Sequence, residues 1–310
     1  MRHTHPPDEA AENGDNDGFR DLYQDCSLCP RNCHVDRTRG EQGFCRTGDQ
    51  AVISSTGLHF GEEAPLVAGS GSGTIFFSGC NLRCEFCQNW TIAHRGAGRV
   101  VSDETLAKTM MSLADQKAAN INLVTPSHVV PNILAAVKLA RAEGLSLPVV
   151  YNTSSYEETE TITLLEGTVD IYLADIKWMD PAVAGRLAEG APRDYPGKAQ
   201  AAVEAMYRQV GPLQTDKSGR ALKGLMLRHL VMPNRTAGTV SFVRWVADRL
   251  SPDLYVNLMP QYRPEHRAHR HPDINRPITQ EEWREALTWA REAGLTRLDE
   301  RGDSGLFFRR

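Results

Sequence analysis

Three closely spaced cysteines carry the clearest chemical signal in the sequence. Cys80, Cys84 and Cys87 form a C-x3-C-x2-C run directly after a short apolar segment that ends in Gly79. Three thiolates on one loop can each bind one iron of a cubic [4Fe–4S] cluster, so the fourth iron stays open to a chelating small molecule. Tetrahedral zinc usually takes its ligands from two separated pairs of residues. The spacing therefore favours a [4Fe–4S] cluster over a zinc knuckle or three unliganded thiols.

A second set of four cysteines precedes this loop. Cys26, Cys29, Cys33 and Cys45 have the spacing C-x2-C-x3-C-x11-C, and Gly40 and Gly43 between them allow tight backbone turns. Four thiolates form a complete metal site, which is typical of structural zinc or of an electron-relay iron–sulfur cluster. The sequence predicts a second metal here, and both identities stay open.

The distribution of the cysteines argues against disulfide bonds. All seven lie within the first 87 residues, and the odd number in a chain with no apparent signal peptide is a poor disulfide framework. The acidic stretch over residues 1–20 has no apolar core and is expected to be a disordered tail. These features predict a cytoplasmic protein.

Composition excludes several classes of protein. The 310 residues are 41% hydrophobic and 24% charged, which is enough for a globular core. A formal net charge of −4 disfavours a general nucleic-acid-coating protein. No apolar run is long enough to span a membrane, so neither nucleic acid nor membrane is an expected partner.

The elements that must position the cysteines alternate between strands and helices. Short apolar runs predict strands at 73–79, 120–125, 147–152, 169–175, 224–231 and 253–259. Helices are predicted from the cap at Ser102 through Leu113, from Pro131 to about Glu143, and near 157–166, 198–210, 238–250 and 280–293. Six such repeats predict an α/β fold, a partial (β/α)6 barrel of the TIM type with a small N-terminal four-Cys module.

The predicted organisation has three parts. We expect the tail over residues 1–20, the Cys-rich metal module over 21–66 and the barrel over 67–310. In such barrels, active groups gather at the carboxyl ends of the parallel strands. The polar residues that follow or close the predicted strands obey that rule.

Several motifs resemble one family when they are taken in order. The C-x3-C-x2-C loop with Phe86 before its last cysteine resembles the radical S-adenosylmethionine superfamily. Later segments resemble the branch related to pyruvate formate-lyase activating enzymes: Ile121–His128, Tyr172–Asp180, Leu227–Asn234 and Tyr255–Pro264. The resemblance covers about residues 21–300.

The resemblance implies cofactors, chemistry and partners. It implies a [4Fe–4S] cluster that reductively cleaves S-adenosylmethionine to a 5′-deoxyadenosyl radical, which abstracts hydrogen from a substrate. The activase-like motifs imply a protein substrate and a reductant such as a flavodoxin or ferredoxin. Because the activases carry extra cysteines after the loop whereas this chain carries four before it, a known glycyl radical enzyme is a weaker expectation for the substrate.

The resemblance also assigns cofactor contacts to individual residues. Lys177 suits the carboxylate of S-adenosylmethionine, and Asp175 its amino or ribose groups; the alternative is a mutual structural ion pair. Arg228 offers a planar fork for a carboxylate, with a structural arginine as the alternative.

Further contacts are implied at the ends of earlier strands. Asn152 and Ser154 stand where ribose or methionine contacts would lie. Thr125 and Ser127 stand where the activases bind the methionine amino group, although this chain has Thr-Pro-Ser in place of a Gly-Gly-Glu type sequence. Phe86 is assigned to the adenine, and ordinary loop packing is its alternative.

A basic segment and two rival functions complete the expectations. Residues 263–276 are rich in Arg and His; a solvated loop is the default interpretation, and a rim attracting an anionic partner is the alternative. The chain could also be an iron–sulfur electron carrier, or a zinc-binding interaction protein without S-adenosylmethionine chemistry. The electron carrier does not explain the polar residues at the strand ends.

Overall fold

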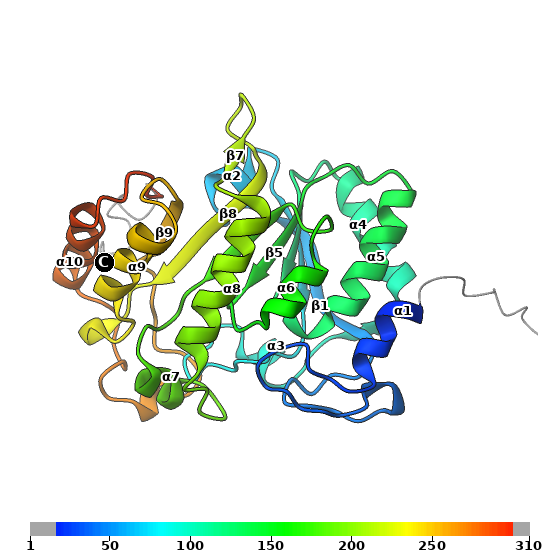
Figure 1. The fold of residues 1–310 in the computed structure, drawn as a ribbon, viewed down its shortest axis with the longest axis horizontal. Helices are drawn as coiled ribbons and strands as arrows, with labels where there is room; N and C mark the ends of the chain where they lie inside the picture. Colours follow the sequence, from blue (N-terminus) through cyan, green and yellow to red (C-terminus); the bar gives the residue numbers. More distant parts are fainter. Residues whose placement is uncertain (1–16, 300–310) are drawn as a thin grey trace, which may run out of the picture.

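Six parallel strands form the central sheet in the computed structural model, which describes residues 17–299 (Figure 1). Their spatial order follows the chain: β2 (Ser72–Phe77), β4 (Ile121–Val124), β5 (Val149–Thr153), β6 (Ile171–Asp175), β8 (Ala221–Leu230) and β9 (Tyr255–Met259). All five residues of β5 are buried, as is typical of parallel strands that are covered on both faces.

Helices between these strands and after the last one cover the outer side of the sheet (Figure 1). They are α4 (Asp103–Asp115), α5 (Val130–Ala142), α6 (Thr159–Leu164), α8 (Tyr195–Val210), α9 (Thr239–Arg249) and α10 (Gln280–Glu292). The predicted helix starts have physical causes: the Ser102 hydroxyl caps α4, and Pro131 lies in the first turn of α5. The predicted α/β partial barrel is confirmed.

Three strands that the sequence analysis missed extend the sheet in the antiparallel sense. β1 (Ala51–His59) pairs with β2, β3 (Arg99–Val101) pairs with β1, and β7 (Gln214–Thr215) pairs with β8. The centre of β1 is the half-exposed polar run Ser54–Thr56, so it lacks the continuous apolar pattern that marked the other strands. Because β1 extends the barrel sheet, part of the predicted module 21–66 is continuous with the barrel.

The predicted tail falls largely outside the described residues. Residues 17–20 form α1 (Asp17–Arg20), and Arg20 donates to Asp49 over 2.6 Å. Residues 1–16 of that tail, and 300–310 of the predicted barrel domain, are not described.

The carboxyl ends of the parallel strands meet the N-terminal Cys-rich segment. In Figure 1 that dark-blue segment lies along the lower edge together with α3 (Trp90–Ala93) and α7 (Pro181–Leu187), whereas α2 (Ala64–Val67) lies at the opposite edge. The described residues also contain five single-turn 3-10 helices: η1 (Asp21–Tyr23), η2 (Arg37–Arg39), η3 (Ser127–Val129), η4 (Pro233–Arg235) and η5 (Ala268–Arg270).

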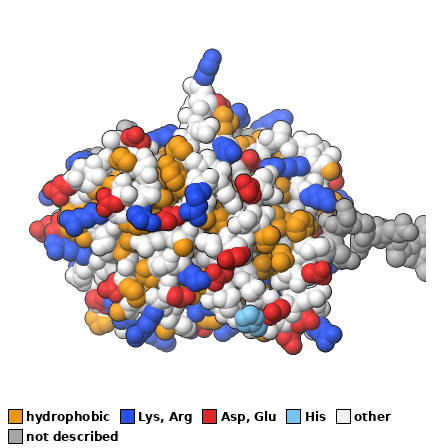
Figure 2. Space-filling model, viewed as in Figure 1, with side chains coloured by type: hydrophobic (Ala, Val, Ile, Leu, Met, Phe, Trp, Pro, Cys, Tyr) orange, Lys and Arg blue, Asp and Glu red, His pale blue; other side chains and the backbone are white. Residues whose placement is uncertain are grey.

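Figure 2 shows acidic and basic side chains interspersed over the face viewed. None of the helices within residues 17–299 has both the length and the apolar character to span a membrane.

Candidate active site

A cavity of about 470 Å³ opens at the carboxyl ends of the parallel strands. Cys80, Cys84 and Cys87 line one side of it. The other side is formed by polar side chains in the last residues of β4, β5, β6, β8 and β9 or just after them, namely Thr125, Asn152, Thr153, Ser154, Asp175, Lys177, Arg228 and Gln261. The fold therefore brings together residues that lie up to 181 positions apart in the chain (Cys80 to Gln261).

The cysteine loop is held in place by backbone hydrogen bonds. The Cys80 Sγ atom accepts from the backbone N–H groups of Leu82 at 3.3 Å and Arg83 at 3.4 Å. The Glu85 N–H donates to the carbonyl of Leu187 over 2.9 Å, so the loop is fixed against the end of α7. Amide donors to a sulfur stabilise a thiolate and tune the potential of an iron–sulfur cluster.

The other two thiols have lost much of their contact with water. Burial raises the pKa of Cys84, and it raises the pKa of Cys87 to about 12. Without a metal both groups are neutral thiols near pH 7, and a bound metal is what holds buried sulfurs as thiolates. Three thiols that share one cavity fit a cluster with one iron left for another ligand.

A network of charges faces the cysteines across the cavity. The Asp175 carboxylate accepts from Lys177 Nζ at 2.8 Å and from Arg228 Nε at 2.6 Å. Burial raises the pKa of Asp175, but the Arg228 and Lys177 cations outweigh that effect and hold it below its usual value. The carboxylate is therefore ionised, and the two cations are its direct partners.

Arg228 also joins two further elements of the cavity wall. Its Nη2 donates to Asn152 Oδ1 over 2.6 Å, and its Nη1 lies 3.4 Å from Glu62 Oε2. Burial raises the pKa of Glu62. The sequence analysis missed Glu62, because nothing in the sequence shows that the segment after β1 turns back over the ends of β6 and β8.

Phe86 packs against other aromatic residues and also faces the cavity. It lines the cavity, and its ring makes edge contacts with Trp178 at 5.9 Å and Tyr262 at 5.5 Å between centroids. Packing of this kind fixes the end of the cysteine loop.

Ser127 is the one predicted cofactor contact that does not line this cavity. It is buried, and its hydroxyl donates to Glu157 Oε1 over 2.5 Å. The Thr153 hydroxyl donates to the same oxygen, and burial raises the pKa of Glu157 to about 7. Glu157 was missed because the sequence marks it only as the start of the helix predicted near 157–166, whereas the structure buries its side chain completely.

The four N-terminal cysteines surround a second, small cavity. Cys26, Cys29, Cys33 and Cys45 all line it, and Leu28 and Phe44 contribute apolar walls. Burial raises the pKa of the Cys29 thiol. Within residues 17–299, no group of three or more Cys, His, Asp or Glu side chains is arranged as a closed shell around one metal ion, so the thiols of either cysteine set would have to move closer together to bind one.

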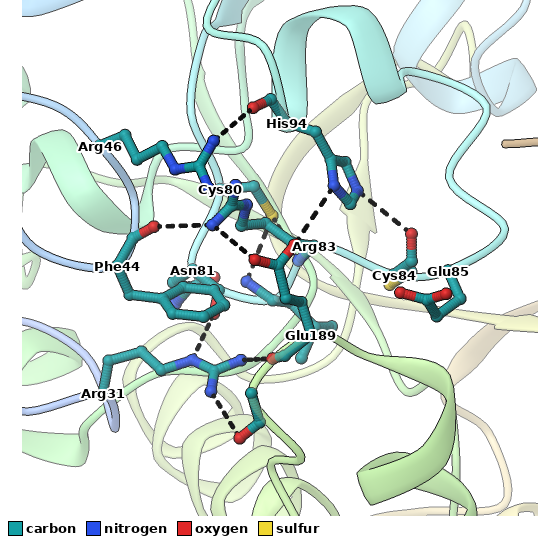
Figure 3. Close-up of polar contacts among 12 residues, drawn as sticks. Arg31, Phe44, Arg46, Cys80, Asn81, Arg83, Cys84, Glu85, His94 and Glu189 are labelled. Atoms are coloured by element: carbon teal, nitrogen blue, oxygen red, sulfur yellow. Dashed lines mark hydrogen bonds and ion pairs between the residues drawn. The ribbon is translucent and has the colours of Figure 1, made fainter. Parts of the chain in front are cut away.

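Cations and an aromatic ring join the two cysteine sets (Figure 3). The Arg31 guanidinium stacks over the Phe44 ring at 3.7 Å and donates from Nε to the carbonyl of Asn81 over 2.8 Å. Arg83 donates to the carbonyl of Phe44 over 3.3 Å and pairs with Glu189 at 3.2 Å. Residues next to Cys33 and Cys45 are thus bonded to residues next to Cys80 and Cys84.

The basic segment 263–276 is only partly solvated. Its Arg267 lies 3.3 Å from Glu85 of the cysteine loop, and its His266 ring stacks on Trp90 of α3 at 5.2 Å between centroids. Arg186 of α7 pairs with Asp273 at 2.6 Å. The default interpretation as a solvated loop is therefore wrong for these residues, because the segment packs over the cysteine loop.

Known proteins resemble this chain both in sequence and in fold. A family profile described as a 4Fe-4S single cluster domain matches residues 67–184. An uncharacterized protein of Methanocaldococcus jannaschii is 32% identical over 283 residues, which cover 89% of this chain and 77% of that protein. The pyruvate formate-lyase-activating enzyme of Clostridium pasteurianum is 28% identical over 136 residues, 40% of this chain and 53% of that enzyme.

A solved structure shows the same architecture. The radical SAM methyltransferase of Sphaerobacter thermophilus matches with a TM-score of 0.52 at 16% identity, over 76% of this chain and 68% of that chain. At this identity the likeness concerns the fold. The matched profile spans the first four strands of the parallel sheet and contains the loop with Cys80, Cys84 and Cys87.

Proposed function

Because the chain belongs to the radical S-adenosylmethionine superfamily and its profile match indicates a [4Fe–4S] cluster, we propose that this cluster binds at Cys80, Cys84 and Cys87 and cleaves S-adenosylmethionine. When bound, these groups supply a one-electron cleavage of the sulfonium–C5′ bond, which yields methionine and a 5′-deoxyadenosyl radical that takes a hydrogen atom from the substrate. The observation that carries the proposal is one cavity lined by all three thiols and by ionised side chains opposite them.

The residues of this chain supply binding and orientation. Lys177 and Arg228 are the cations that suit the cofactor carboxylate, and Asp175 suits its amino or ribose groups. Asn152, Ser154 and Thr125 offer polar atoms at the neighbouring strand ends, and Phe86 offers a ring for the adenine. The Thr153 and Ser127 hydroxyls bond to Glu157, so that Ser127 supports the wall from behind.

A protein is the proposed substrate class, and a flavodoxin or ferredoxin the proposed reductant. The support is the partial similarity to a pyruvate formate-lyase-activating enzyme, which covers 40% of this chain. This finer assignment is separate from cofactor cleavage and is tested separately, by incubating the reduced enzyme and S-adenosylmethionine with proteins labelled with deuterium. Mass spectrometry should then detect deuterium in the 5′-deoxyadenosine that is released if a protein supplies the hydrogen atom.

The test of cofactor cleavage uses protein that is purified and reconstituted without oxygen. We expect an electron paramagnetic resonance signal that changes when S-adenosylmethionine is added, and release of 5′-deoxyadenosine after reduction with dithionite. Cys84→Ala should abolish this release, because it removes one ligand of the cluster. Retained turnover in that variant would refute the assignment.

A matched cysteine variant separates the two sites. Cys29→Ala removes a thiol from the other cavity and should keep the S-adenosylmethionine-responsive signal. If wild-type protein binds only zinc at both sites, the zinc-binding interaction protein is the better description. If a cluster forms but its signal never responds to S-adenosylmethionine, the iron–sulfur electron carrier is the better description.

A further inference from the structure

A buried arginine beside the four N-terminal cysteines has no acidic partner among the groups that bond it. Arg37 is 1% exposed and lines the same cavity as the four thiols. Its guanidinium donates to the carbonyls of Gly48 and His128 at 2.9 and 2.8 Å and to the Thr47 hydroxyl at 2.9 Å. Its Nη1 lies 3.8 Å from Cys26 Sγ, and its Cζ lies 4.0 Å from the centre of the Tyr23 ring.

The charge of this guanidinium must be balanced inside the protein. Arginine stays protonated in proteins, and an isolated buried charge is strongly unfavourable. Carbonyls and a ring face supply dipoles, but none of these neighbours supplies a full negative charge. The four cysteines are the remaining groups around the cavity that can become anions.

We propose that Cys26, Cys29, Cys33 and Cys45 bind a metal centre as thiolates, and that Arg37 balances the negative charge of this centre. Four thiolates around zinc or around a [4Fe–4S] core leave the site negatively charged, so both centres suit a buried cation. The other contacts of the sulfurs agree with thiolates: the Phe44 N–H donates to Cys33 Sγ over 3.3 Å, and the Thr47 hydroxyl lies 3.1 Å from Cys45 Sγ.

The centre would abut the proposed cluster of the active site. A Cβ atom placed on Gly79 would lie 2.8 Å from the carbonyl oxygen of Cys45 and 3.2 Å from His128 Nε2, so only glycine allows this approach. Gly79 precedes Cys80, and His128 lines the four-cysteine cavity. The segment that would hold the second centre therefore packs directly against the start of the loop that carries Cys80.

The experiment isolates the second site in the full chain. A variant with Cys80, Cys84 and Cys87 all replaced by alanine is expressed and purified without oxygen, and its iron, sulfide and zinc are measured per chain. We expect either about four iron and four sulfide or about one zinc. Adding Cys29→Ala should remove that metal. If the triple variant contains no metal and all four of its remaining thiols react with an alkylating reagent, the proposal is overturned. This outcome does not depend on what the wild-type protein does with S-adenosylmethionine.

Variants of Arg37 test the balancing charge. In the triple-alanine background, Arg37→Gln should release the metal to a chelator about 10–100-fold faster, as for other residues that contact ligands, and Arg37→Lys should largely restore retention. The control is Arg39→Gln, two residues away with a side chain 83% exposed. Unchanged release from Arg37→Gln would overturn the role of Arg37. Should that variant fail to fold, Arg37→Lys decides, since it keeps the charge and must retain the metal.

Discussion

Asp175 bonds to two cations in the wall of the candidate active site. One oxygen accepts from Lys177 and the other from Arg228, so the carboxylate holds two cations of the cavity wall in fixed positions. The ion pair between Asp175 and Lys177, which was the alternative to a cofactor contact in the sequence analysis, is therefore present. It still faces the proposed cofactor site, because all three side chains line the cavity. The ion pair is therefore compatible with the proposed binding role of these residues.

Lys177→Met tests whether this cation binds the cofactor. Loss of a charge-assisted hydrogen bond worth about 1.5–3 kcal/mol should weaken S-adenosylmethionine binding roughly 10–100-fold. Equilibrium dialysis of the reconstituted protein measures the affinity. The control is Lys198→Met on α8, which removes a comparable bond, 2.7 Å long, to Glu158 outside the cavity. If wild type and Lys177→Met bind S-adenosylmethionine with equal affinity, Lys177 serves only in the structural ion pair with Asp175.

At the scale of elements, side-chain caps fix the ends of the helices that cover the barrel, and α10 is the clearest example. The Thr279 hydroxyl accepts from the N–H of Glu282 at 3.2 Å, and the Glu282 carboxylate accepts from the Thr279 N–H at 2.8 Å, a capping box at the start of α10. Arg276 donates to the same carboxylate, which is the main cause that lowers the pKa of Glu282 to about 2. This cap anchors the segment that follows β9.

Glu282→Gln should lower the free energy of unfolding by about 1 kcal/mol at pH 7, because it removes the charge from the cap. The pKa of Glu282 is lower in the folded protein than in the unfolded chain, so its contribution is present above about pH 4.5 and is lost as the pH falls toward 2. Urea unfolding at pH 7 and pH 5 should therefore give the same difference between wild type and variant. Glu281→Gln, an exposed neighbour in the same turn, is the control; an equal loss there would indicate a general charge effect.

At the scale of the whole molecule, buried histidines couple stability to pH. His229 of β8 is completely buried, bonded to the carbonyl of Ile176 at 2.7 Å and stacked on Phe242 at 4.3 Å between centroids. Burial lowers the pKa values of His229 and of His128 to about 4. Both rings are neutral in the folded protein and become protonated near pH 6.5 when the chain unfolds.

The free energy of unfolding should therefore fall as the pH falls from about 6.5 toward 5. At each of the two histidines the unfolded chain binds more protons than the folded protein in this range, which contributes up to about 1.4 kcal/mol per pH unit. Glu157, whose pKa burial raises to about 7, contributes in the opposite sense, and the two histidines outweigh it. Urea titrations between pH 5 and pH 8 measure the slope, and His229→Gln should reduce it. A slope that this variant leaves unchanged would contradict the assignment of the effect to His229.

The sequence alone was enough to identify the two cysteine sets as candidate ligands and to predict the six parallel strands and the helices that alternate with them. These features depend on local spacing: thiols within one loop, apolar runs of strand length, and caps next to amphipathic segments. The same reasoning places Asp175, Lys177 and Arg228 at strand ends, because a parallel barrel gathers such ends at one edge.

Tertiary structure alone decided which polar side chains are buried and what they contact. Ser127 points to Glu157, Glu62 reaches Arg228, and Arg37 lies against the four N-terminal thiols. The half-exposed strand β1 also forms only because β2 supplies its hydrogen-bond partner. A polar residue is buried where distant parts of the chain satisfy its bonds and its charge, and no local pattern records that partnership.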